Sequence, residues 1–446
     1  MRSKYLWVCI ILGTTACKKD KVMPDDQNEI ISPVTGTRRE FTLDSIYLYA
    51  KQIYLWNDAL PDYDTFDPRN KYRYYTPDLT AFQTELYDIA QLKINPGTMR
   101  AYEYPVLEGK AKYSYMINGA VPGKIAAEVP EASAANPTCI TTILDAGPAK
   151  VGYIYLSSFP ELSTAKPYLD DAFQQFASAA PSDLIVDLRS NGGGYVETAE
   201  YLANLIAPPG LNGKVMYTAQ FNSRMQQGKA MILRNQRYLD ENGKPVIRNG
   251  KTATMADVDF SEHGNTHTFS KKGSLKTVKN LYFIVSGNTA SASELLINSL
   301  KPYLNVKLAG SKTYGKPVGF FGVTIDRYTI YMSSFLIKNA LGSADYFDGM
   351  PVDIPVLSDD GYVPGNPGEA CLKSVLKCIQ PEITSTTSAK DIHLKPGIKI
   401  MTIPQTKKEN TPVVLNGMIE HRVRLKTSNN NNQQVPFRTT TNHFPE

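Results

Sequence analysis

The stretch Leu184-Ile-Val-Asp-Leu-Arg-Ser-Asn-Gly-Gly-Gly194 joins a short apolar run to a turn of three glycines. A helix-period pattern follows the turn and stops at Pro208-Pro209, because proline ends a helix. Apolar runs of this kind are typical of strands that are covered on both faces. We therefore expect a buried strand, a tight turn and a helix, which together form the repeating unit of an α/β fold.

The same order of strand and helix occurs on both sides of this stretch. Val151–Leu156 precedes a pattern that places Leu169, Ala172, Phe173 and Phe176 on one helix face. The apolar run Leu281–Val285 precedes a second helix that starts near Ser291. Repeated strand-helix units predict an α/β core with a largely covered sheet.

The rest of the chain divides by composition. Two amphipathic patterns predict an N-terminal helical domain, with apolar faces formed by Ile46, Ala50, Ile53 and Trp56 and by Phe82, Leu86, Ile89 and Ala90. The pair Val323–Ile325 and Tyr328–Met332 around Asp326-Arg327 predicts a hairpin. The expected organisation is a tether at 18–40, a helical domain at 41–110, a linker at 111–150, a core at 151–380 with a polar excursion or surface cap at 211–279, and a partly disordered extension at 381–446.

The N-terminus has the pattern of a secretory signal. Arg2 and Lys4 precede the apolar run Tyr5–Gly13, which is too short to span a bilayer. Small residues and then Cys17 follow, a pattern that looks like a bacterial lipobox. We expect residues 1–17 to be a lipoprotein signal and the mature chain to be lipid-anchored through Cys17 in the cell envelope, at the periplasmic face or outer membrane of a bacterium. The alternative is an ordinary signal peptide with an incidental cysteine.

Charge and turn chemistry argue against nucleic-acid and nucleotide binding. The net charge of +5 is modest, and the basic residues are scattered rather than gathered in a stripe. The glycine turn is followed by Tyr195-Val196 instead of the Lys-Ser/Thr of a phosphate-binding loop, and it lacks the dinucleotide spacing. We expect no nucleic-acid partner.

Ser291 and Lys316 are the candidate catalytic residues. Ser291 is expected at a helix N-terminus, where unpaired N–H groups and the helix dipole favour a developing negative charge. Lys316 follows after one helix and another apolar run. The first histidine is His263, so a Ser-His-Asp arrangement has no histidine to use before the polar excursion. A lysine can replace it as the base if burial lowers its pKa.

Three blocks of sequence carry a family resemblance. They are Gly152-Tyr-Ile-Tyr-Leu-Ser-Ser-Phe159, Asp187-Leu-Arg-Ser-Asn-Gly-Gly-Gly194, and Thr289-Ala-Ser-Ala-Ser-Glu294 with Thr313-Tyr-Gly-Lys316. Over roughly residues 40 to 380 the chain resembles the carboxyl-terminal processing peptidases, or tail-specific proteases. The resemblance implies a crotonase-like or Clp-protease-like core, Ser291 as nucleophile and Lys316 as base. It also implies an oxyanion hole formed by Ala292 and Gly193, with Gly192 as an alternative to Gly193.

The chain also departs from this family. Most relatives carry a PDZ module in the region of 95–150, but its glycine-rich carboxylate loop is missing here, so 111–150 is a linker or a PDZ remnant. Phe320 occupies the position where relatives often have a glutamine that orients the lysine. Glu294 could orient the lysine instead, or it could cap the helix dipole. Ser293 is a rival nucleophile, although the family pattern assigns Ser291.

These patterns predict a serine endopeptidase that works through an acyl-enzyme with a Ser-Lys dyad. Its partners would be polypeptide substrates and, through the lipid anchor, a membrane; no metal or organic cofactor is implied. The alternative is a catalytically weak or inactive peptide-binding or scaffold lipoprotein of the same fold. A third hypothesis is an acyl-transfer enzyme that binds a thioester cofactor. The sequence does not decide the oligomeric state.

Overall fold

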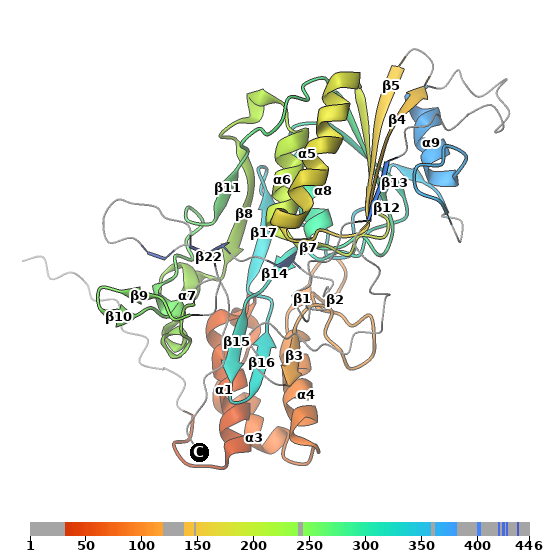
Figure 1. The fold of residues 1–446 in the computed structure, drawn as a ribbon. Helices are drawn as coiled ribbons and strands as arrows, with labels where there is room; N and C mark the ends of the chain where they lie inside the picture. The colour runs from red at the N-terminus through yellow and green to blue at the C-terminus, as the bar shows by residue number, and fades with distance from the viewer. Residues whose placement is uncertain are drawn as a thin grey trace, which may run out of the picture.

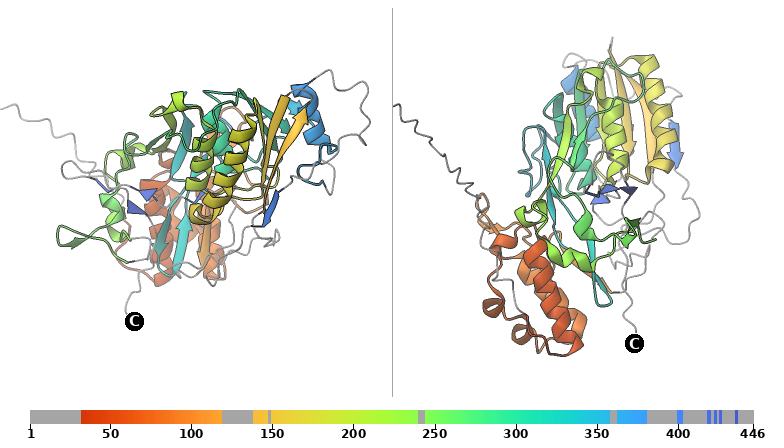
Figure 2. Two further views of the ribbon diagram at one scale, coloured as in Figure 1. Left: turned by 45° about the horizontal axis from the view of Figure 1, so that its top comes forward. Right: turned by 90° about the vertical axis from the view of Figure 1, so that its left-hand side faces the viewer.

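The computed structural model describes residues 32–118, 138–146, 149–239, 244–357 and 362–380, together with short strands further along the chain. These residues form a mixed α/β structure with a seven-stranded, a four-stranded and a three-stranded sheet, and a helical N-terminal region at one end (Figures 1 and 2). The predicted α/β core with N-terminal helices is confirmed. The predicted signal and lipobox at 1–17 lie outside the described residues.

The seven-stranded sheet forms the centre of the core. In order across the sheet, its strands are β18 (Ile354–Pro355), β13 (Asn305–Gly310), β12 (Asn280–Val285), β6 (Asp183–Asp187), β5 (Ala149–Leu156), β4 (Thr138–Ala146) and β19 (Lys399–Thr402). The strands from β18 to β5 are parallel, while β4 and β19 are antiparallel additions. Parallel neighbours need crossover connections, which are provided by α5 (Leu162–Ala179) and α8 (Ala292–Leu300).

Both faces of this sheet are covered. The helices α5, α6 (Val196–Ile206) and α8 lie on one face, and α9 (Ala370–Ile379) lies on the other (Figure 1). Because side chains alternate along a strand, Val186 of β6 packs toward the first group of helices and Ile185 toward α9. This double burial explains why the central strands are apolar without interruption.

Two smaller sheets connect the core to the N-terminal region. The four-stranded sheet has the order β11 (Thr266–Thr268), β8 (Val215–Phe221), β17 (Phe335–Asn339) and β14 (Val318–Gly319), and the three-stranded sheet has the order β15 (Gly322–Ile325), β16 (Tyr328–Tyr331) and β3 (Tyr115–Asn118). The predicted hairpin is confirmed, since Ile325 pairs with Tyr328 across a turn in which Asp326 has a φ of 55°.

The segment 211–279 is not only a polar surface excursion. Its strand β8 is a central strand of the four-stranded sheet, and Met216, Tyr217 and Phe221 are buried. The polar average of the segment concealed this strand, because its buried residues are separated by exposed polar ones. Its other elements are η2 (Pro209–Leu211), α7 (Ser223–Gln226), η3 (Met231–Asn235), β9 (Ile247–Arg248), β10 (Lys251–Thr252) and η4 (Met255–Asp257).

The interval 111–150, expected as a linker or PDZ remnant, supplies strands to two sheets. β3 pairs with β16, and β4 pairs along its whole length with β5. The expected boundary at residue 150 therefore falls inside the main sheet. β4 contains Thr138, Thr141, Thr142 and Asp145, so its sequence resembles a polar connection although Ile140 and Leu144 are buried. Residues 119–137 lie outside the described residues.

The N-terminal region is built on two helices that lie side by side in Figure 1, α1 (Arg38–Ile53) and α4 (Asp78–Ala90), and Arg39 pairs with Asp78 where both helices begin. Thr37 and Glu40 form a capping box that starts α1 slightly before the expected boundary at 41. The predicted apolar faces are buried, although Trp56 lies beyond the end of α1. The smaller elements are η1 (Asn57–Ala59), α2 (Tyr63–Phe66), α3 (Pro68–Lys71), β1 (Ile94–Asn95) and β2 (Arg100–Ala101).

Short strands of the C-terminal region return to the body of the protein. β20 (Met418–Ile419) pairs in parallel with β7 (Gly194–Tyr195), and Leu425 forms a bridge with Val258. β21 (Arg422–Val423) pairs with β22 (Val435–Pro436), while most of the predicted extension 381–446 lies outside the described residues. In the described part of the chain, every helix is too short or too polar to span a bilayer.

Candidate active site

Ser291 stands at the junction between β12 and α8. It is the N-cap of α8 with φ 62° and ψ −113°, a strained conformation for a residue with a side chain, which costs about 1–3 kcal/mol. Its side chain is fully buried, and among the described residues its Oγ has no hydrogen-bond partner. Strain of this kind at a strand-to-helix turn is typical of nucleophilic serines, because it presents the hydroxyl ahead of the helix N-terminus.

One carboxylate joins the Ser291 segment to the Lys316 segment. Oε2 of Glu294 accepts hydrogen bonds from the backbone N–H groups of Ser291 (2.9 Å) and Lys316 (2.8 Å). The two nitrogens are therefore no further apart than the sum of these distances. Oε1 accepts from Gly315 N–H (2.7 Å) and the Thr313 hydroxyl (2.5 Å). Glu294 thus caps the start of α8 and also anchors the Lys316 backbone, so both roles that the sequence allowed for it are present at the level of the backbone.

The hydrogen bonds of Glu294 favour its ionised form. Burial raises the pKa of this carboxyl, and the four donated hydrogen bonds act in the opposite direction. Both oxygens already face donors, so a proton on either of them would displace a hydrogen bond. These hydrogen bonds limit the rise in the pKa of Glu294 that burial causes, although burial is the larger influence.

Lys316 lies on the loop between β13 and β14 and is 4% exposed. Burial lowers its pKa to about 7, and the charges of Glu103 and Glu294 oppose this shift only in part. Its Nζ lies 4.5 Å from the ring centroid of Phe320, the residue at the expected glutamine position. A lysine with this pKa is partly neutral near pH 7, and only the neutral amine can accept a proton.

The glycine turn is fastened to the loop that carries Ser291. The Thr289 hydroxyl donates to Leu188 O (2.9 Å), and the Ser286 hydroxyl donates to Arg189 O (2.5 Å). Asn191 O accepts the Ser293 hydroxyl at 3.0 Å. Ser293, the rival nucleophile, therefore holds the turn in place, which separates its role from that of Ser291.

The two predicted oxyanion-hole residues lie beside Ser291. Gly193 has a φ of 112°, and a Cβ added to it would be 3.0 Å from the Ser291 Cβ and 3.2 Å from the Ala292 nitrogen. Ala292 supplies the first N–H of α8, which has no acceptor within the helix. The Gly193 N–H, however, donates to Asn191 Oδ1 at 2.9 Å in this structure. Gly193 thus lies beside Ser291, but its N–H group is already engaged.

His267 lies in β11, stacks on Tyr217 and contacts Glu200 through Nδ1 at 2.9 Å. Among the residues that the structure describes, no group of His, Cys, Asp and Glu side chains could hold a metal ion.

Comparisons with known proteins identify a family for part of the chain. Residues 150–332 match the model of peptidase family S41. Similar solved structures include a candidate S41 protease from Bacteroides fragilis (16% identity, 79% of this chain and 99% of the other, TM-score 0.49), a photosystem II D1 C-terminal processing protease (14%, 76% and 97%, TM-score 0.45), and a lipoprotein from Streptococcus agalactiae (14%, 73% and 94%, TM-score 0.40). A search of curated proteins gave no match. The resemblance in the motifs is confirmed: the segment 150–332, which holds the glycine turn, Ser291 and Lys316, is a domain of peptidase family S41.

Proposed function

We propose that this protein is a serine endopeptidase of the cell envelope in which Ser291 is the nucleophile and Lys316 the general base. The observation that carries this proposal is the common anchoring of both segments on Glu294 Oε2, at 2.9 and 2.8 Å. The lowered pKa of Lys316, about 7, supports the same assignment because a base is most useful when its pKa is close to the working pH. The S41 family supports a peptidase function in general.

The reaction would proceed in two halves. Lys316 takes the proton of Ser291 Oγ while that oxygen bonds to the substrate carbonyl carbon, and the negative charge on the carbonyl oxygen is stabilised by the Ala292 N–H. Lys316 then gives its proton to the leaving amine as the peptide bond breaks, which leaves an acyl-enzyme on Ser291. In the second half, Lys316 takes a proton from water as the water oxygen bonds to the ester carbon, and it gives this proton to Ser291 Oγ as the ester bond breaks, which releases the acid and restores both residues. Losing one backbone donor of an oxyanion hole costs about 10²–10³ in rate.

Hydrolysis of casein and of fluorogenic peptides by the purified protein tests this proposal. Ser291→Ala and Lys316→Ala should abolish turnover, and Lys316→Arg should not restore it, because arginine does not deprotonate in proteins. Ser299→Ala, a buried serine on the same helix, and Lys271→Ala, whose pKa burial lowers to about 8, should remain active. Activity in the arginine variant would rule out Lys316 as the base.

The pH dependence should identify the base. Since the neutral amine is the active form, kcat/KM should rise as the pH increases through about 7 and should level off above it. A profile without this rise would assign the proton transfer to another group.

Two observations favour the second candidate, a peptide-binding protein with little or no activity. The Ser291 side chain is fully buried, and the Gly193 N–H is already bonded to Asn191 Oδ1. In that case peptides should bind equally to the wild type and to Ser291→Ala, and neither protein should hydrolyse them. Isothermal titration beside the hydrolysis assay separates the two candidates.

We further propose that Cys17 carries a lipid anchor, on the basis of the short apolar run and small residues before it. Cells expressing the full chain should incorporate labelled palmitate, and the protein should partition into detergent. Cys17→Ala should lose both properties, and Cys9→Ala, which changes a cysteine inside the same apolar run, should keep them. Full incorporation in Cys17→Ala would disprove the anchor.

A further inference from the structure

Glu103 is a buried carboxylate outside the segment that matches the peptidase family. It follows β2 and is fully buried. Its Oε2 accepts the N–H groups of Ser114 (2.7 Å) and Tyr113 (3.2 Å). Its Oε1 accepts the hydroxyls of Ser114 (2.8 Å) and Tyr54 (3.1 Å). Burial raises the pKa of this carboxyl, and the four hydrogen bonds that it receives, like those of Glu294, oppose that rise by favouring the ionised form.

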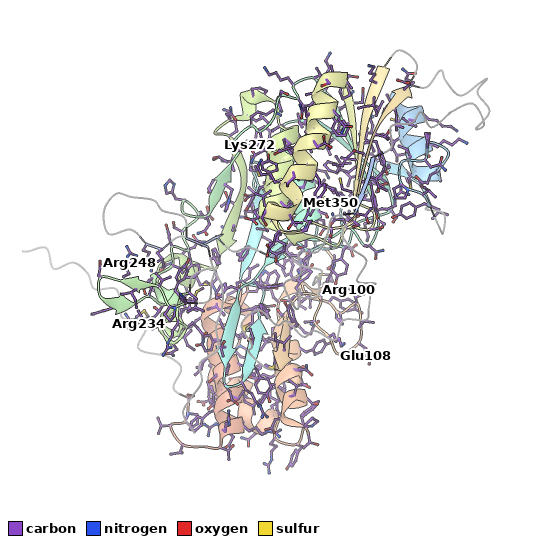
Figure 3. The ribbon with its side chains drawn as sticks, in the orientation of Figure 1. Arg100, Glu108, Arg234, Arg248, Lys272 and Met350 are labelled. Atoms are coloured by element: carbon purple, nitrogen blue, oxygen red, sulfur yellow. The ribbon has the colours of Figure 1, made fainter. Side chains whose placement is uncertain are left out.

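The segment that holds Glu103 is packed against the loop of Lys316. The Tyr113 hydroxyl donates to Gly315 O at 2.5 Å, and Lys112 Nζ donates to Tyr314 O at 3.0 Å. Figure 3 labels Arg100 and Glu108, which lie on either side of Glu103 in the sequence, in the region between the N-terminal helices and the core. Tyr113 is consequently a bridge: its backbone binds Glu103 and its hydroxyl binds the residue before Lys316.

A second contact reaches the amine itself. The Phe320 ring, which lies 4.5 Å from Lys316 Nζ, packs edge-on against Tyr115 with the centroids 5.5 Å apart. Tyr115 follows Ser114, one of the partners of Glu103. The amine therefore lies against Phe320, and the strand that begins with Tyr115 supports that ring.

The charges around the amine single out Glu103. Among the opposing influences on Lys316, the charge of Glu103 raises the pKa most, followed by that of Glu294. Other titratable groups lie in the same cluster: the charge of Glu294 acts on Lys112, Tyr113, Tyr314 and Tyr346, and that of Glu103 acts on Tyr54. Two carboxylates from distant parts of the chain thus face one buried amine.

We propose that Glu103 is a positioning residue for Lys316, holding the amine in place and keeping it a strong enough base to take the serine proton. A phenyl ring at position 320 offers a cation only a weak attraction and no hydrogen bond, so it does not replace the missing amide. A base whose pKa falls too far becomes a poor proton acceptor. A nearby negative charge limits this fall in pKa. The expected effect of Glu103 on catalysis rests on the proposed function, but its effect on the pKa of Lys316 can be measured without turnover.

The decisive measurement is an NMR titration of Lys316 in protein labelled with ¹³C,¹⁵N-lysine. It is made in the inactive Ser291→Ala background, and the Lys316 signal is assigned by its absence in Lys316→Met. Glu103→Gln should lower the pKa of Lys316 by about one unit or more, the usual effect of removing an adjacent opposite charge. The matched control is Glu85→Gln, another buried glutamate in the N-terminal region, whose charged neighbours are Asp44, Lys71 and Asp88. It should leave the titration of Lys316 unchanged.

Kinetics separates positioning from a general effect on folding. In the active background, Glu103→Gln should move the rise of kcat/KM to lower pH and reduce the plateau, with KM little changed. If Glu103→Gln does not fold by circular dichroism, Glu103→Asp, which moves the charge back by one methylene, should still lower the pKa of Lys316. An unchanged titration in the folded variant overturns the inference. If the wild type proves inactive but Glu103→Gln still lowers the pKa of Lys316, the proposed function is overturned and the electrostatic effect of Glu103 on Lys316 stands.

Discussion

Arg189 and Lys316 are two buried cations that each have two carboxylates near them, and their surroundings act on them in opposite directions. Arg189 is 3% exposed. Burial alone would lower its pKa, but hydrogen bonds with Glu369 and Asp187 outweigh burial and hold the pKa above its usual value. At Lys316, burial dominates and the pKa falls to about 7. The number of nearby charges therefore does not decide which cation stays charged.

The difference lies in what the carboxylates bind. Asp187 and Glu369 bind the guanidinium directly, at 2.8 and 2.6 Å. The oxygens of Glu103 and Glu294 instead receive hydrogen bonds from backbone N–H groups and hydroxyls, four for each carboxylate. The charges of Glu103 and Glu294 raise the pKa of the Lys316 amine, but burial outweighs them. The first arrangement makes a permanent structural cation, and the second makes a cation that can lose its proton near neutral pH.

The largest expected effect comes from breaking the Arg189 cluster. Arg189→Met leaves Asp187 and Glu369 buried without their cation, which should lower the free energy of unfolding by about 3–5 kcal/mol. Urea unfolding measures this value. The control is Arg38→Met, which removes an arginine that is 74% exposed and pairs with Asp326, and it should lower the free energy of unfolding far less because solvent screens an exposed ion pair. Equal losses in the two variants would mean that Arg189 is no more structural than a surface arginine.

At Lys316, by contrast, removal of the cation should increase the free energy of unfolding. The folded pKa of about 7 is below the unfolded value near 10.4, so between these pH values the unfolded chain binds more protons and stability rises with pH. Below pH 7 the cost of burying the charge is present in full. Lys316→Met should therefore be more stable than the wild type by about 2 kcal/mol at pH 6, part of the gain being offset because Glu103 and Glu294 lose a cation. Urea unfolding at several pH values should show this advantage shrinking toward pH 10; an advantage independent of pH would contradict the lowered pKa.

The strands that were predictable from sequence are the ones buried on both faces. β5, β6 and β12 have apolar centres, so local composition identified them without knowledge of their neighbours. β4 and β8 were missed because they contain polar residues and lie inside segments that are polar on average. Their identity as strands depends on pairing with β5 and with β17, which is information held in distant parts of the chain.

The candidate site shows the same limit. Ser291, Lys316 and the glycine turn belong to local motifs, and the structure fastens their segments to one another through Glu294. Asp187 and Arg189 could also have been connected, since residues two apart on a strand share a face. Glu103 gave no signal of its own, because its partners Ser114 and Tyr54 and the loop that it faces are brought to it only by the fold.

The smallest expected effect tests whether the surroundings of Arg189 and those of Lys316 act independently of each other. Tyr153 donates its hydroxyl to Asp187 at 2.8 Å, and Tyr113 donates its hydroxyl to Gly315 at 2.5 Å; both tyrosines are buried. Each substitution by phenylalanine removes one hydrogen bond, so both variants should lose about 1–2 kcal/mol of stability in urea unfolding. Only Tyr113→Phe should also change the pH profile of kcat/KM, because only that hydroxyl holds the Lys316 loop. A shifted profile in Tyr153→Phe would show that the Arg189 cluster acts on the base through the glycine turn, and the division into one structural and one reactive cation would then fail.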